Sequence, residues 1–277
     1  MQAHTRLYLG IPLMLLAGSL CLLRQGIAQD ALHGWKVEAR ATAIELVAVE
    51  EPGRSTASAA FVLKNVSTAP IMTIAVSLDG GETFELADYF HTPMTLQPGA
   101  TYSLDVGNRK RSDKTLVLLA VVFASGAGEG REDVVGAIRA SHLGQALELE
   151  RIKSILDGLE VQDGQDPGDS VLDAIDGKLG TGPNSPTDAF AAVQGIRMPG
   201  ADTNSVRSAG DLAIGNFYAG VRAARMLARG TLEQLRRVPV GSLDRPARAD
   251  LFSEWRESCG AASARNHALL EAAGGVR

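Results

Sequence analysis

The acidic run from Asp163 to Asp169 carries the side chains that could bind Ca²⁺. An EF-hand loop needs oxygen ligands at positions 1, 3, 5, 7, 9 and 12, with glycine at position 6. Counting from Asp163, position 5 is Pro167 and position 12 is Ala174, so the bidentate glutamate is missing. The run therefore predicts a solvated loop that leads into a helix capped by Asp169.

A second motif, Ser77 to Phe84 (SLDGGETF), resembles the Asp-box Ser-x-Asp-x-Gly-x-Thr-Trp, with Phe84 in place of tryptophan. Asp79 can accept hydrogen bonds from its own turn, and the glycines permit positive φ. Asp-boxes are familiar from sialidase-type β-propellers, where they recur away from the catalytic centre. A propeller needs at least four sheets, so one copy here predicts a structural hairpin. A glycosidase would also need a carboxylate pair across a cleft, which no motif singles out.

Nucleophilic and metal-binding side chains are few. Cys259 lies on an apolar helical stripe, so we expect a buried thiol, with an intermolecular disulfide as the alternative. The other members of the stripe are Phe252, Trp255, Ala262, Leu269 and Ala273. No metal-binding spacing such as HExxH joins the scattered His33, His91, His142 and His267. Phosphate loops and nucleophile elbows are also missing, so we predict no catalytic residue, cofactor, metal ligand or nucleotide.

One face of a predicted long helix carries four arginines: Arg222, Arg225, Arg229 and Arg236. They indicate either an anionic partner or a solvated face, and we favour a solvated face paired with carboxylates such as Asp157 and Glu233. Small residues recur at every fourth position of the same helix, as Gly215, Ala219 and Ala223 and as Gly220, Ala224 and Ala228. Such spacing lets a second helix approach closely and predicts a tight bundle.

The elements that must position these residues change type near residue 128. Before it, β-branched runs alternate with turn signals about every ten residues, which is typical of a β-sandwich. Strands are expected within 35–49, 59–66, 71–78, 82–90, 101–106 and 115–124. In the first, Ile44 and Leu46 should face one side and Val47 and Val49 the other. The last has no polar alternation, so we expect a central strand buried on both faces.

After Gly128 the apolar period becomes helical. Helices are predicted over 131–159, 169–179, from Ser185-Pro186 onward, over 204–238 and over 244–273, with Gly144 as a candidate break. The first carries an apolar stripe of Val135, Ile138, Leu149, Ile152, Leu156 and Leu159. The fold class is therefore α+β in two parts, a β-sandwich over 29–128 and a helical region over 129–277. Whether the helices pack on the sandwich is left open.

Residues 1–28 have the layout of a secretory signal peptide. The uncharged run Leu7 to Leu23 follows Arg6 and ends near the small-residue site Gly26-Ile27-Ala28, so we expect export and cleavage after about Ala28. The destination would be the periplasm or the extracellular space. Retention of residues 7–23 as an inner-membrane anchor is the alternative, because 17 residues are at the lower edge of a spanning length. A lipobox ending in Cys21 would indicate a lipoprotein. The pattern expects glycine or alanine directly before the cysteine, and this chain has Leu20 there, so we favour cleavage near Ala28 over lipidation.

The composition argues against a disordered chain and against a nucleic-acid-binding protein. Of the 277 residues, 45% are hydrophobic and 21% charged, which favours a packed core over disorder. The net charge is -5, and the leader holds two arginines and no carboxylate, so removal leaves an acidic chain unsuited to nucleic acid. Cys259 would be the only remaining cysteine. The core must then stabilise the chain without an intrachain disulfide.

Residues 35–145 resemble exported bacterial proteins of unknown function that carry an immunoglobulin-like β-sandwich. Three segments carry the resemblance: Phe61 to Asn65 with Ser67 and Ile71, then Leu96-x-Pro98-Gly99-x-x-Tyr102-x-Leu104, and Leu118 to Phe123 running on to Ile138 and Leu143-Gly144. The resemblance implies the immunoglobulin-like fold and carries no catalytic residues.

The function predicted is a non-enzymatic envelope or secreted module, in which the sandwich binds a protein or polysaccharide and the helices assemble or dock. Nucleic acid is not expected as a partner, and membrane only if residues 7–23 are retained. The alternative is a hydrolase of cell-envelope or extracellular glycans or peptides, with its site at the sandwich–helix junction. A cleft that gathers carboxylates with His142 or His91 would favour the hydrolase.

Overall fold

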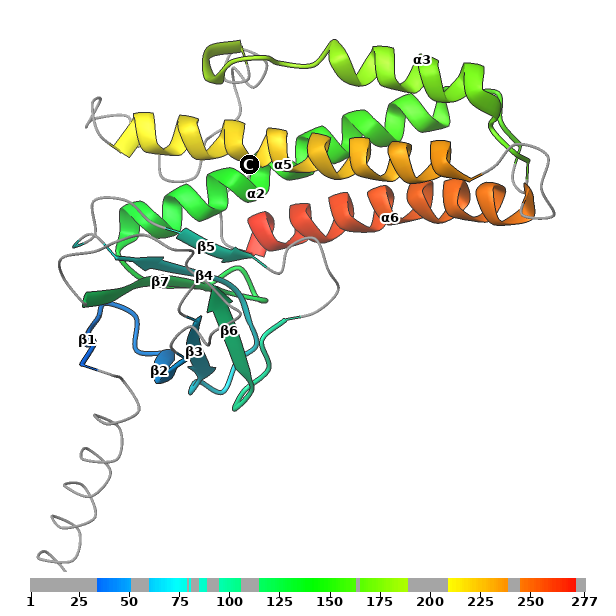
Figure 1. Ribbon diagram of the computed structural model, residues 1–277. Coiled ribbons are helices and arrows are strands. Elements are labelled where there is room, and N and C mark those ends of the chain that lie inside the picture. Colours follow the sequence, from blue (N-terminus) through cyan, green and yellow to red (C-terminus); the bar gives the residue numbers. More distant parts are fainter. Residues whose placement is uncertain are drawn as a thin grey trace, which may run out of the picture.

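The computed structural model describes residues 34–50, 60–78, 80, 85–88, 95–105, 115–162, 165–188, 209–238 and 245–272. Strands come first in the chain and long helices follow (Figure 1). The strands are β1 (Lys36–Ala39), β2 (Ile44–Glu50), β3 (Ala60–Asn65), β4 (Ile71–Ser77), β5 (Glu85–Asp88), β6 (Thr101–Asp105), β7 (Thr115–Phe123) and β8 (Gly128–Gly130). The helices are α2 (Glu132–Asp157), α3 (Gly168–Gly180), α5 (Ala209–Arg237) and α6 (Arg245–Ala272). None of the described helices is both long and apolar enough to span a bilayer, and the predicted leader lies outside these ranges.

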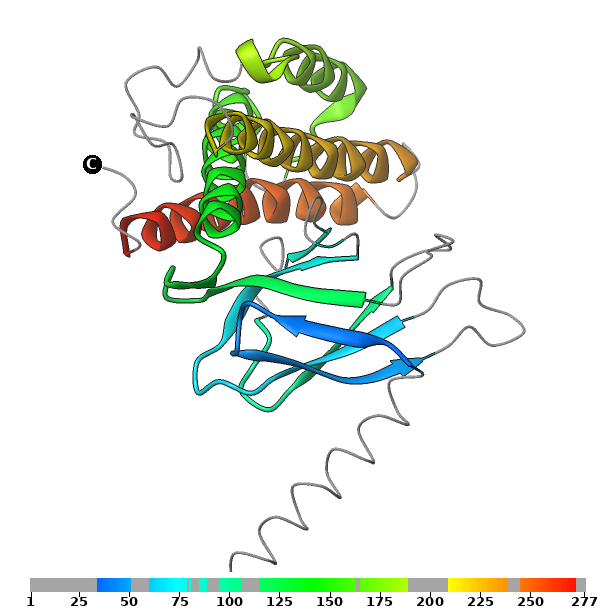
Figure 2. The same cartoon turned by 90° about the vertical axis from the view of Figure 1, so that its left-hand side faces the viewer.

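The strands form two sheets that lie below the helices in Figure 2. One sheet has the order β2-β3-β6 and is antiparallel throughout. In the other, β4 pairs antiparallel with β5 and with β7. The far edge of β7 is shared: β1 pairs parallel with Thr115–Leu118, and β8 pairs antiparallel with Ala120–Val122. The predicted strand within 35–49 is thus two strands, and β8 was not predicted.

Inward side chains of both sheets form one core cluster. The three-stranded sheet contributes Ile44, Leu46, Val49, Phe61, Leu63 and Leu104, and the other sheet contributes Ile71, Ile74, Val76, Leu116, Leu118 and Val121. Val49 joins Ile44 and Leu46 in this core, which corrects its predicted orientation. The cause is an irregularity in register between Leu46 and Ala48, because a β-bulge reverses the alternation of every side chain beyond it.

The inner strands β4 and β7 are buried on both faces, as predicted for residues 115–124. The outer face of β7 packs on the first turns of α2, where Val117 and Leu119 contact the cluster that includes Ile138. Gly130 has a φ of 111° and lies so close to β7 that a Cβ would overlap the Leu119 carbonyl. The turn into α2 therefore requires glycine, and the helical half packs directly on the sheet.

The long helix α2 is central to the helical half. Beyond the sheet it packs against α3, α5 and α6 (Figure 1). One cluster joins Leu149, Ile152 and Leu156 of α2 to the apolar faces of the other three helices, so the predicted stripe on α2 is covered. The bounds of α5 and α6 agree with the helices predicted there.

Helix α2 continues unbroken through Gly144, which corrects the predicted break. A Cβ at Gly144 would overlap the carbonyl oxygen of Phe217 on α5, and a Cβ at Gly220 would overlap the carbonyl oxygen of Ser141 on α2. The two glycines therefore let the backbones of α2 and α5 meet. The row of Gly220, Ala224 and Ala228 is buried as the small-residue spacing predicts, whereas Gly215 and Ala219 are exposed.

Candidate functional site

The acidic run holds an arginine from α6. Arg248 is 1% exposed, and its Nη2 lies 2.7 Å from Asp169 Oδ1 while its Nε lies 3.3 Å from Asp166 Oδ1. The helix α3 begins at Gly168 after Pro167 without a side-chain cap, so the predicted cap at Asp169 is wrong. Asp166 instead accepts a bond from the amide of Gly168. Asp163 lies outside the described residues, and no cluster of metal-binding side chains occurs within them.

The Asp-box motif falls at the connection between β4 and β5. These strands pair antiparallel, with Val76 opposite Glu85, as expected for a hairpin. Gly80 has a φ of 77°, which favours glycine. Asp79 and residues 81–84 lie outside the described residues, as do His33 and His91.

The junction between sheet and helices is filled by packed side chains where the structure describes it. His142 on α2 is 2% exposed, and its Nε2 lies 3.1 Å from Thr73 Oγ1 on β4. Ser141 and Gln145 on the same helix are also buried. The imidazole of His142 therefore lies in packed interior against Thr73 of β4.

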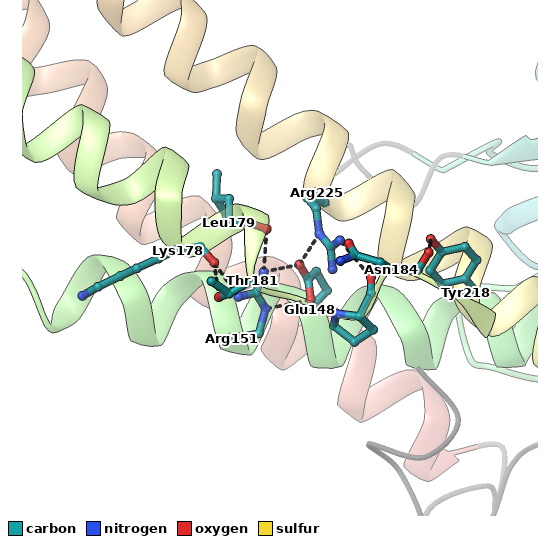
Figure 3. Close-up of polar contacts among 9 residues, drawn as sticks. Glu148, Arg151, Lys178, Leu179, Thr181, Asn184, Tyr218 and Arg225 are labelled. Carbon is teal, nitrogen blue, oxygen red and sulfur yellow. Dashed lines mark hydrogen bonds and ion pairs between the residues drawn. The ribbon is translucent and has the colours of Figure 1, made fainter. Parts of the chain in front are cut away.

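A buried ion cluster joins α2 and α5 (Figure 3). Glu148 Oε1 accepts hydrogen bonds from Arg225 Nε at 3.0 Å and from Arg151 Nη2 at 2.7 Å. The second carboxylate oxygen, Oε2, accepts from Arg151 Nε at 3.0 Å. Both oxygens of this carboxylate are thus occupied by guanidinium groups. Such charge-assisted bonds are strong where water is excluded.

The same two arginines hold the loop that leaves α3. Arg151 Nη1 donates to the carbonyl of Lys178 at 3.1 Å, where a helix C-terminus has unpaired carbonyls and a partial negative charge. Arg225 Nη1 donates to the carbonyl of Pro183 at 2.9 Å. A Cβ at Gly182 would overlap Arg225 Nη2, so a larger residue there would displace this guanidinium from its present position. The cluster fixes the path of residues 178–183, and the Glu148 carboxylate serves to hold Arg151 and Arg225 in place.

Arginines of the predicted cationic face have different partners from those expected. Arg225 pairs with Glu148, and Arg236 pairs with Asp173 and Asp176 of α3. The carboxylates suggested from the sequence, Asp157 and Glu233, pair with neither Arg225 nor Arg236. Asp157 pairs with Lys153 and Glu233 pairs with Arg237. Arg222 and Arg229 are exposed.

A pocket of about 380 Å³ opens between α5 and α6 above Leu149 of α2. It exists because facing positions carry small side chains. The described residues that line it are Leu149, Ala224, Leu227, Ala228, Thr231, Trp255, Ser258, Cys259, Ala261, Ala262 and Arg265. These include no carboxylate and no imidazole. Two sequence patterns contain residues of this pocket: the small-residue row ending in Ala224 and Ala228, and the apolar stripe with Trp255 and Cys259. Both patterns predict helix packing, and neither predicts a pocket.

Polar groups in the pocket are largely engaged by their own helices. The Ser258 hydroxyl donates to the Trp255 carbonyl at 2.8 Å, and the Thr231 hydroxyl donates to the Leu227 carbonyl at 3.2 Å. Among the described residues that line the pocket, Arg265 alone is charged, and Arg265 already has an interaction partner. The described lining is therefore apolar apart from this one engaged side chain.

Cys259 forms part of the pocket wall and is buried, as predicted. Burial raises the pKa of its thiol to about 11, and bonds with Trp255 and Ser258 and the charge of Lys153 offset only part of that effect. A thiol with a raised pKa is protonated at neutral pH and is a poor nucleophile. The geometry supports a packing side chain at the pocket and not a catalytic one.

Comparisons of this chain with protein-family models, curated proteins and solved structures find no match.

Proposed function

We propose that this chain is an exported, non-enzymatic binding protein in which an immunoglobulin-like β-sandwich supports a helical half that holds the ligand. The signal-peptide layout of residues 1–28 supports export. The carrying observation for binding is the pocket between α5 and α6, whose described lining is apolar apart from Arg265. Ligand pockets in proteins are typically of this kind, with volumes of about 300–1,000 Å³.

Strand order supports the immunoglobulin-like part of the proposal. The sheet β2-β3-β6 corresponds to strands A-B-E of that fold, and β5-β4-β7 corresponds to C′-C-F. The short β8 pairs with β7 where strand G would lie. On this correspondence, the sandwich is a rigid base whose outer sheet face is already used by α2.

The arrangement of the polar groups favours binding over hydrolysis. A hydrolase needs an acid–base pair within reach of its substrate, and the described pocket lining offers none. The buried charges Glu148 and Arg225 bond to each other and to the chain. Their role in this proposal is to hold the helices that form the pocket walls.

Localisation tests the proposal. The full-length chain with a C-terminal tag is expressed in its native host, and each cell fraction is analysed by intact mass. Cleavage after Ala28 and recovery outside the cytoplasm are the expected results, and the variant Ala28→Glu should accumulate with its leader in the membrane fraction. Recovery of the unprocessed chain in the cytosol would overturn export. Crosslinking in the same cells reports any bound partner.

A further inference from the structure

We infer that β1 is an exchangeable strand, and that two copies of this chain form a dimer by placing β1 of each on the β7 edge of the other. The inference goes beyond the proposed binding function and does not depend on the pocket. It is drawn from how β1 is attached, from where the chain after it becomes fixed, and from which strand fits the edge of β7.

The main chain of β1, more than its side chains, holds it in place. The strand lies at the edge of its sheet, blue in Figure 2, and among the described strand pairs only β1 with β7 is parallel. All four side chains of β1 are exposed, whereas β7 is buried on both faces. Buried side chains provide most of the free energy that docks a strand, so β1 contributes little. It covers the main-chain groups of Thr115–Leu118, which would otherwise be an open edge.

One aromatic side chain anchors the strand. Trp35, directly before β1, packs on the sandwich core, and its ring meets the ring of Phe61 on β3 edge-to-face with 4.7 Å between the centroids. Phe61 is fully buried, so departure of the indole would expose an apolar surface to water. A strand that replaces β1 must therefore bring an equivalent aromatic anchor.

The chain becomes fixed directly after β1. The amides of Arg40 and Ala41 both donate to the Leu118 carbonyl, at 2.8 and 3.2 Å. The Glu129 carboxylate accepts hydrogen bonds from the hydroxyl of Thr42 at 2.8 Å and from its amide. Because Glu129 lies on β8, this hold on the start of β2 does not depend on β1. The hinge for release of β1 is therefore at the first two of these residues.

A second copy of the chain offers the matching strand. Its β1 takes the same register on β7 and brings the same tryptophan to Phe61, so exchange replaces each contact with an identical one. The cost is confined to the association of two molecules and to the hinge, and a short connection such as residues 40–43 favours exchange. Residues 35–41 extend at most about 25 Å. The β7 edges of the two copies must then lie side by side, which makes the exchange reciprocal.

A disulfide placed between β1 and β7 tests the exchange. Lys36 lies opposite Thr115 and neither is buried, so Lys36→Cys with Thr115→Cys can be joined by oxidation. Cys21→Ala and Cys259→Ala remove the native thiols. The full chain is purified under reducing conditions as its host processes it, equilibrated at a series of concentrations and then oxidised. Non-reducing electrophoresis resolves the denatured products.

A bond between chains is expected only where β1 has exchanged. Closed molecules carry the bond within one chain and run as monomers, whereas exchanged molecules run as covalent dimers. While monomer predominates, an about tenfold rise in protein concentration should raise the ratio of dimer to monomer about tenfold by mass action. Two glycines inserted after Arg40 should lower that ratio several-fold, because a longer connection relieves the hinge of the closed molecule.

A second pair of cysteines, on strands that do not exchange, is the matched control. Lys64→Cys with Thr101→Cys joins β3 to β6, where the two positions face each other. This pair should give monomers alone at every concentration. Circular dichroism checks that the variants are folded.

Three outcomes would overturn the inference. Bonds within one chain at every concentration would show that β1 stays on its own β7. Covalent dimers from both cysteine pairs would indicate opening of the whole sandwich and not exchange of β1. Chains linked into long series would show open-ended exchange in place of a reciprocal dimer. None of these results bears on ligand binding or on export, which are tested separately.

Discussion

Glu148 Oε1 accepts a 3.0 Å hydrogen bond from Arg225 Nε, and the two side chains are only 3% and 9% exposed. The bond joins α2 to α5 at a point where water is largely excluded. Removing two charges from water is costly, so a buried pair is stable only where further hydrogen bonds complete it. Arg151 and the carbonyl of Pro183 supply those bonds here.

Removing the charge of Glu148 should destabilise the protein strongly. In Glu148→Gln the buried Arg225 guanidinium and the partly exposed Arg151 guanidinium lose their anion, so we expect the free energy of unfolding to fall by about 3 kcal/mol in urea titrations at pH 7. Glu233→Gln is the matched control, because Glu233 pairs with Arg237 where the side chains are 66% and 80% exposed. The control should change the free energy by less than about 1 kcal/mol. Equal losses in both variants would contradict the buried cluster.

Glycines on α2 and α5 should differ sharply in their tolerance of alanine. A Cβ at Gly220 meets the backbone carbonyl of Ser141, which cannot move without separating the helices, so Gly220→Ala should destabilise the protein by several kcal/mol, about the cost of severe overpacking. Gly215 lies on the same helix with nothing within 4 Å of its Cβ position. Gly215→Ala should stabilise the protein by about 0.5–1 kcal/mol, since alanine is the better helix former. Thermal unfolding of both variants measures the contrast, and a loss in both would show that the contact is not the cause.

Local periodicity predicted the element types well because it depends on neighbouring residues alone. The apolar run of β3 between turn signals, the continuous apolar run of β7 and the helical stripe of α6 each place the element within a few residues of its observed bounds. The three-residue β8 has two glycines and no periodicity, so no local signal exists for it. The bulge near Val47 likewise depends on how β2 meets its partner strand.

Contacts between distant residues were not predictable in the same way. Arg248 lies 79 residues after Asp169, and Arg225 lies 77 residues after Glu148. Each of these residues has the sequence context of a solvated helix face, and only the packing of α2, α3, α5 and α6 brings them together. The pocket is even harder to predict from the sequence, because it forms where small side chains on α5 face small side chains on α6.

Glu129 should make stability depend on acid pH. Partial burial raises the pKa of its carboxyl, but bonds from the Thr42 hydroxyl and from the amides of Thr42 and Ala43 outweigh burial, so the pKa lies below its ordinary value of 4.5. A group whose pKa is lower in the folded state stabilises the protein above its unfolded pKa, and that contribution is lost as the pH falls through the folded pKa.

Chemical unfolding at two pH values measures this contribution. Glu129→Gln should be less stable than the parent chain at pH 7, and the difference should shrink as the pH is lowered to 3, because the parent carboxyl takes up a proton as the pH falls through its lowered pKa. Glu45→Gln, at an exposed position of β2, is the control and should show no such trend. A difference that is the same at both pH values would assign the effect to shape and not to charge.

The Cys259 thiol should resist alkylation until the protein unfolds. Burial raises its pKa to about 11, so at pH 8 only about one thiol in a thousand is ionised, and the thiolate is the form that reacts. Iodoacetamide should therefore modify native Cys259 about a hundredfold more slowly than the unfolded chain, with the difference narrowing towards pH 11. Mass spectrometry of the peptide that contains Cys259 gives the rate.

A control variant places a thiol one residue away. Ser258→Cys in a Cys259→Ala background supplies it at an exposed position, where it should react at the rate of an ordinary exposed thiol. Rapid labelling of native Cys259, or a dimer on non-reducing gels that Cys259→Ser removes, would contradict a thiol held in the pocket wall.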